Sequence, residues 1–123
     1  MENINSYKDL KVWKPAMSVA ELAYKATRHF PRDEVFGMSA QIRRAATSIA
    51  ANIAEGHGRE TPGAFVQFVR MSQGSLKELE TLVLLAMTVS LGNADELSRM
   101  VSKCDELGKM LRSLIRSLQR EMQ

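Results

Sequence analysis

Apolar residues recur three or four positions apart along most of this 123-residue chain, which is the period of an amphipathic α-helix. Breaks in the pattern separate four such segments, and the predicted helices cover roughly residues 9–29, 33–56, 62–91 and 94–121. Because the connections between them are short, consecutive helices are expected to pack as antiparallel neighbours. The sequence therefore predicts one all-α domain, an antiparallel up-down-up-down four-helix bundle.

The same spacing predicts which side chains form the core. In the first helix they are Leu10, Trp13, Met17, Ala20, Tyr24 and Thr27. In the third they are Phe65, Val69, Ser72, Leu76, Leu79, Val83 and Ala86. In the fourth they are Leu97, Met100, Cys104, Leu107, Leu111, Leu114 and Leu118.

Prolines and polar residues mark the helix ends. Pro15 lies within the first pattern, so either the helix begins just before it and holds it in the first turn, or Pro15 kinks the helix. Thr61 before Pro62 is a favourable N-cap for the third helix. Asn93, with Glu96 as its capping partner three residues later, is the predicted N-cap of the fourth.

The second helix carries two different stripes. One is apolar and consists of Ile42, Ala45, Ala46, Ile49 and Ile53. The other is polar and consists of Gln41, Arg44, Ser48, Asn52, Glu55 and Arg59. Short polar side chains between alanines are unlike an ordinary solvated face, so we expect Gln41, Ser48, Asn52 and Glu55 to join helices or subunits through hydrogen bonds.

The third helix is apolar nearly all round between Thr81 and Leu91. A helix in a small bundle needs one buried stripe, so the remaining apolar surface requires another cover. A second copy of the chain is the expected cover. The candidate interface residues are Leu82, Leu84, Leu85 and Met87.

The formal net charge of +3 permits nucleic-acid binding without requiring it. The fourth helix has a basic ridge at helical spacing, made of Lys109, Arg112, Arg116 and Arg120. Arg43, Arg44 and Arg59 of the second helix are further candidates for phosphate contacts, and structural salt bridges are the alternative. The basic ridge is either a nucleic-acid-binding surface or an ordinary solvated face.

The residues indicate no enzyme, metal site or cofactor. The two histidines lie in different connections, and no serine or cysteine has a histidine at helical spacing. Gly56-His57-Gly58 lacks the Lys-Ser/Thr of a phosphate-binding loop. The N-terminal residues lack the pattern of a secretory signal and no apolar run is long enough to span a bilayer, so we expect a cytoplasmic protein with no membrane partner.

Four motifs together resemble a known bacterial family. They are Asp9-Leu10-x-Val12-Trp13, Phe30-Pro31-x-x-Glu34, Gln41-Ile42-Arg43-Arg44-Ala45-Ala46-x-Ser48-Ile49-x-x-Asn52-Ile53-Ala54-Glu55-Gly56, and Gly74-Ser75-Leu76-x-Glu78-Leu79-Glu80. The chain resembles the 23S rRNA intervening-sequence proteins over essentially its whole length. The resemblance implies an antiparallel four-helix bundle that assembles as a homopentamer, with no established biochemical activity. A related branch is the accessory protein of diversity-generating retroelements, which binds a reverse transcriptase and nucleic acid.

Two functional hypotheses follow. The first is a homopentameric, non-enzymatic module that binds RNA or DNA weakly and without sequence preference, as an accessory to a reverse transcriptase or another nucleoprotein. The second is a protein-interaction scaffold without a nucleic-acid role.

Overall fold

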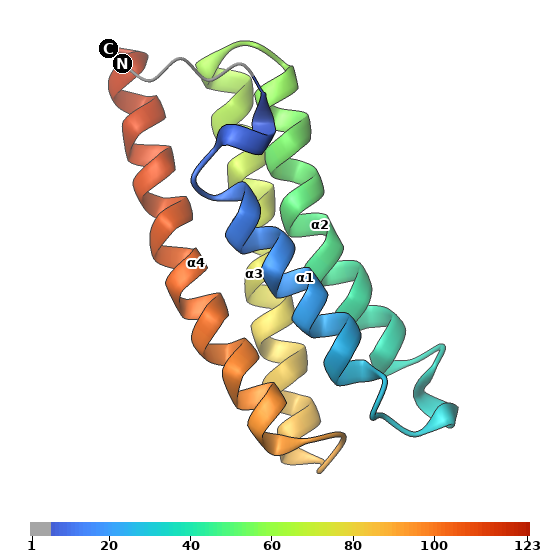
Figure 1. Cartoon of the computed structure of the whole chain (residues 1–123). Coiled ribbons are helices and arrows are strands. Elements are labelled where there is room, and N and C mark those ends of the chain that lie inside the picture. The colour runs from blue at the N-terminus through green and yellow to red at the C-terminus, as the bar shows by residue number, and fades with distance from the viewer. Residues whose placement is uncertain (1–5) are drawn as a thin grey trace.

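The structure, a computed structural model, describes residues 6–123, which contain helices and no strand. The elements are the 3-10 helix η1 (Tyr7–Asp9), α1 (Trp13–Thr27), the 3-10 helix η2 (Arg32–Glu34), α2 (Met38–Gly58), α3 (Pro62–Thr88) and α4 (Ala94–Glu121). Consecutive α-helices alternate in direction (Figure 1), which is consistent with the predicted up-down-up-down arrangement. The all-α class is confirmed. Within the described part of the chain, no helix combines the length and apolar character that a membrane crossing needs.

The helix starts follow the predicted capping residues. Thr61 Oγ1 accepts a hydrogen bond from the Ala64 amide at 3.3 Å, and Asn93 Oδ1 accepts one from the Glu96 amide at 3.0 Å. The Glu96 carboxylate instead accepts from His29 Nδ1 at 2.8 Å, and so ties the end of α1 to the start of α4. Helix α1 begins at Trp13, later than the predicted range 9–29. Of the two alternatives for Pro15, the first is confirmed: Pro15 lies in the first turn, where its missing N–H breaks no helical hydrogen bond.

The buried face of α1 differs from the predicted one. Met17 and Tyr24 were predicted to be core residues, but they are 45% and 43% exposed. The buried positions of the helix are Ala16, Val19, Ala23, Ala26 and Thr27. The prediction followed the largest apolar side chains, whereas the helix buries a neighbouring stripe made mostly of small ones. Small side chains allow the axis of α1 to approach the bundle closely.

The other helices follow their predicted faces more closely. All seven predicted core positions of α3 and the whole apolar stripe of α2 are buried. In α4 the prediction fails at one position: Ile115 is buried, and Leu114 is only partly buried. Cys104 is buried in the core as predicted.

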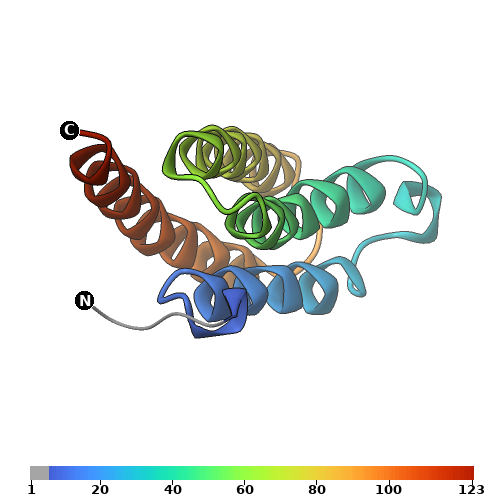
Figure 2. The same cartoon turned by 90° about the horizontal axis from the view of Figure 1, so that it is seen from above.

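Helices α2 and α3 approach closely along their length. A Cβ atom added at Gly56 of α2 would lie 2.5 Å from the Phe68 Cβ atom of α3, so only glycine fits there. Two turns away, the buried Ser72 hydroxyl donates to the Ile49 carbonyl at 2.9 Å. Seen along the bundle, α4 diverges from α1 toward its C-terminal end (Figure 2).

Candidate nucleic-acid and assembly surfaces

The polar stripe of α2 joins two helices at its centre. Ser48 Oγ lies 2.9 Å from Ser75 Oγ of α3. Asn52 Nδ2 donates to both the carbonyl and the hydroxyl of Ser48, each at 2.9 Å. Ser48 and Asn52 are half-buried. Ser48 thus makes one bond between helices, as the short polar side chains suggested, whereas the Asn52 bonds lie within α2. The joining role of Gln41 and Glu55 stays a prediction.

The ends of this stripe hold Gln41 and Arg44 on one side and Glu55 and Arg59 on the other, all exposed. Arg59 Nη2 donates to Glu55 Oε1 at 3.2 Å, and its guanidinium lies 5.0 Å from the ring centre of Phe68. Arg44 has no carboxylate within 4.0 Å among residues 6–123. Of Arg44 and Arg59, only Arg44 is thus without a carboxylate partner among residues 6–123.

Arg43 has contacts within the chain. Its Nε atom donates to Thr27 Oγ1 at 2.8 Å, and its guanidinium lies 4.5 Å from the ring centre of Tyr24. The Thr27 hydroxyl in turn donates to the Ala23 carbonyl at 2.7 Å. Arg43 is half-buried and joins α2 to the C-terminal end of α1. Its nucleic-acid role stays a prediction, and these contacts give it a structural role as well.

The basic ridge lies on the exposed side of α4. Lys109 Nζ is 3.6 Å from Asp105 Oδ2 one turn away. Arg112, Arg116 and Arg120 are exposed, and no carboxylate of residues 6–123 lies within 4.0 Å of their guanidinium nitrogens. Three arginines four positions apart therefore form one row of cations along about 12 Å of helix.

The apolar segment of α3 divides into inner and outer side chains. Leu82 and Met87 are partly buried and pack against the core of their own bundle. Leu84 and Leu85 are 50% and 47% exposed, and Val89, which follows the helix, is 56% exposed. Among the predicted interface residues, Leu84 and Leu85 thus present the larger share of their surface to a partner.

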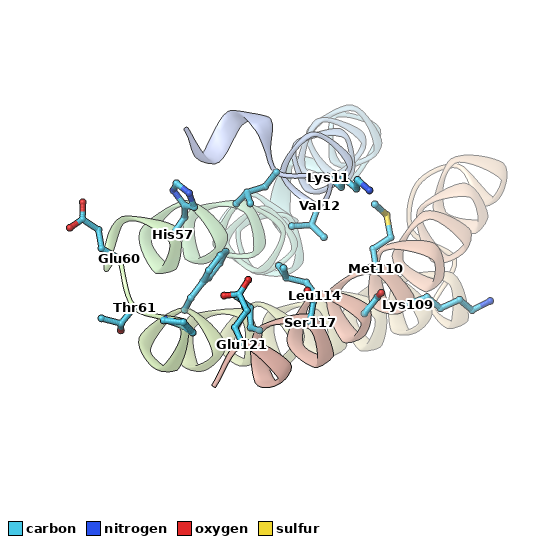
Figure 3. A pocket seen from close by; sticks show the side chains of 15 residues that line it. Lys11, Val12, His57, Glu60, Thr61, Lys109, Met110, Leu114, Ser117 and Glu121 are labelled. Carbon is cyan, nitrogen blue, oxygen red and sulfur yellow. The ribbon is translucent and has the colours of Figure 1, made fainter. Parts of the chain in front are cut away.

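A cavity of about 910 Å³ lies where α4 extends past the start of α1. Val12, Phe65, Met110, Leu114 and Leu118 contribute its apolar lining. Figure 3 shows the Lys109 and Glu60 side chains extending away from it. Sequence reasoning missed this cavity because it depends on how two helices of different length diverge.

Sequence reasoning also missed Phe36, which is 96% exposed in the connection before α2. The signal that could have found it is the pair Val35-Phe36, two large apolar residues placed directly before Gly37 in a connection between helices.

The buried thiol does not form a reactive site. Burial and, to a smaller extent, the nearby Glu80 carboxylate together raise the pKa of the Cys104 thiol from 9.0 to about 12. The thiol is therefore protonated at neutral pH, and a thiol is a poor nucleophile compared with a thiolate. No group of three His, Cys, Asp or Glu side chains suited to a metal ion occurs among residues 6–123.

Comparisons with known proteins agree with the fold and with the sequence motifs. A family model described as 23S rRNA-intervening sequence protein matches residues 8–113. A solved structure of a protein of unknown function, from the S23 ribosomal protein family of Bacteroides thetaiotaomicron, is similar with a TM-score of 0.75. The sequences are 24% identical, and the match covers 85% of this chain and 97% of the other. No protein with curated annotation matches the chain.

Proposed function

Because the chain belongs to the family of 23S rRNA-intervening sequence proteins, we propose that it is a homo-oligomeric, non-enzymatic protein of the cytoplasm that binds RNA or DNA weakly. The row of Arg112, Arg116 and Arg120 carries the proposal, because these exposed cations have no carboxylate within 4.0 Å among residues 6–123. Arginine neutralises phosphate and releases counterions, so the affinity depends on salt.

The binding has little sequence preference. No aromatic side chain lies within the 94–121 range of α4, so the ridge has no platform on which bases could stack. In a symmetric oligomer the ridge repeats in every copy and the potentials of the copies add. Affinity then depends on assembly, and a monomer binds more weakly than the oligomer.

The proposed oligomer is a homopentamer that buries the outer apolar face of α3. Leu84 and Leu85 support this assignment, because about half of each side chain is exposed on one short segment. Replacing either leucine by aspartate places a charge in the contact, and we expect dissociation in light-scattering measurements. A pentamer that survives both changes would place the interface elsewhere.

Charge reversal of the ridge tests nucleic-acid binding. The double variant Arg112→Glu/Arg116→Glu should weaken binding to 23S rRNA fragments at least about tenfold in filter-binding titrations, with the oligomer intact. Lys14→Glu/Lys25→Glu changes the net charge equally on α1 and is the matched control, for which we expect a much smaller loss. The ridge is ruled out as the nucleic-acid-binding surface if the unaltered protein binds no RNA even at low salt, or if both double variants lose the same affinity.

A protein-interaction scaffold without a nucleic-acid role is the second candidate. The exposed residues at the C-terminal end of α3, Leu84, Leu85 and the following Val89, favour it, since an uncharged apolar surface can bind a protein without any phosphate contact. The same double variant separates the two candidates. The scaffold is supported by two results together. The unaltered protein binds no nucleic acid, and the Arg112→Glu/Arg116→Glu variant captures a protein partner as well as the unaltered protein does.

A further inference from the structure

Phe36 is the most exposed of the large apolar side chains that the structure describes, at 96%, and the adjacent Val35 is 50% exposed. Both lie in the connection between α1 and α2, which projects beyond the side of the bundle (Figures 1 and 2). A phenylalanine in water leaves roughly 200 Å² of apolar surface exposed. Single exposed apolar residues are common, but an adjacent pair on a projecting turn indicates a contact surface.

Hydrogen bonds hold this turn in one conformation. The Val35 amide donates to the Arg32 carbonyl at 3.1 Å, and the Gly37 amide donates to the Glu34 carbonyl at 3.0 Å. Glu34 Oε1 accepts from the Met38 amide at 3.2 Å, at the N-terminus of α2, where negative charge is favoured. The Phe36 turn, residues 32–37, therefore presents its ring from a defined backbone, and burying the ring orders little further chain.

A suitable receiving surface lies at the same end of the bundle, because α3 ends where the antiparallel α2 begins. This α3 patch consists of Thr81, Leu84, Leu85, Thr88 and Val89, all exposed. The hydroxyl of Thr81 donates to the Lys77 carbonyl at 2.8 Å and that of Thr88 to the Leu84 carbonyl at 2.9 Å. Each hydroxyl is thus bonded within its own helix, and the patch carries no charged side chain.

We propose that Phe36 of one copy of the chain packs onto the α3 patch of a neighbouring copy. The inference rests on the proposed homo-oligomer and names the two surfaces that form its contact. Both surfaces lie at one end of the bundle, so copies standing side by side with parallel axes can join them. The surfaces are different, so the contact is heterologous and each copy both donates a Phe36 turn and receives one. Such a contact forms a ring when the rotation between neighbouring copies closes.

Two single variants and their mixture test the contact by light scattering at one protein concentration. Phe36→Asp removes the ring but leaves the α3 patch, and Leu85→Asp damages the patch but leaves the turn. Each variant alone should be monomeric. An equal mixture should give particles with the mass of two chains, because one intact turn and one intact patch remain per pair. Both changes add the same charge, so no new ion pair forms between them.

Met122→Asp is the matched control, since Met122 is also apolar, 56% exposed and at the opposite end of the bundle. It should keep the mass of the unaltered protein, and circular dichroism should show all variants folded. The inference is overturned if Phe36→Asp keeps the unaltered mass or if the mixture stays monomeric. A monomeric unaltered protein would instead overturn the proposed oligomer itself.

Discussion

The two sides of the bundle are built differently. Between α2 and α3, a glycine contacts Phe68 and a buried serine bonds to the opposite backbone. Along α4 there are cavities of about 910 and 480 Å³: the smaller lies between α1 and α4, and the larger lies between α4, the segment before α1 and the ends of α2 and α3. Helices α2 and α3 have 21 and 27 residues, whereas α1 has 15 and α4 has 28. The α2–α3 contact is therefore closely packed, whereas α4, the longest helix, leaves space along its contacts.

A methyl group at Gly56 should disrupt the close contact between α2 and α3. The added Cβ atom would lie 2.5 Å from the Phe68 Cβ atom. We expect Gly56→Ala to lower the free energy of unfolding by about 2 kcal/mol in urea titrations, although alanine favours helix. The control is Gly74→Ala on the same pair of helices, where an added Cβ meets nothing within 4 Å. That change should raise stability by about 0.5–1 kcal/mol, and equal effects at the two positions would contradict the close approach.

Removing the Ser72 hydroxyl should weaken the same contact less. Its bond to the Ile49 carbonyl is buried, so Ser72→Ala should cost about 1 kcal/mol in the same titrations. The exposed Ser102 of α4 provides a control, because its replacement by alanine should change stability by less than about 0.5 kcal/mol. If Ser72→Ala changes the free energy of unfolding as little as this control does, the hydrogen bond does not hold the helices together.

Filling the larger cavity along α4 should stabilise the protein. Ser117 of α4 lines the larger cavity, so Ser117→Leu places apolar volume against Leu114 and Leu118. We expect a gain of about 0.5–1 kcal/mol in the free energy of unfolding. Ser98→Leu is the matched change on the exposed surface of the same helix, and it should give no gain. Destabilisation by Ser117→Leu alone would mean that this side is already closely packed.

The smallest effect should come from the link between α1 and α4. Glu96→Gln removes the charge that accepts from His29, and both side chains are partly exposed. Exposed pairs contribute little, so we expect a loss of no more than about 0.5 kcal/mol. A loss above 1 kcal/mol in thermal or urea unfolding would show that this link, and not the core, keeps α1 on α4.

The sequence predicts the helices well because their signals are local. Thr61 and Asn93 mark helix starts by a bond within one turn, and the spacing of large apolar residues identifies the buried face of α3. In α1 the same rule fails, since Met17 and Tyr24 are larger than the alanines that are actually buried. Which stripe is buried depends on the size of the residues on the facing helix, and periodicity does not contain that information.

The candidate surfaces are predicted less completely than the fold. The spacing identifies the exposed arginine row of α4, but the Thr27 and Tyr24 contacts of Arg43 join residues distant in sequence. The exposure of Phe36 likewise depends on the direction of the whole connection. A sequence pattern identifies which residues share a helix face, whereas contacts between elements require the three-dimensional arrangement.

The unmatched length of α4 also affects how the protein opens. The last turns of α4 extend past the start of α1 and are packed mainly on one side, so they can unfold without disturbing the α2–α3 contact. Hydrogen exchange should therefore be graded along this one helix, fast after about residue 115 and slowest near Cys104. Arg116 and Arg120 lie in the segment that opens first, so a bound phosphate backbone would slow the exchange of those amides and of few others.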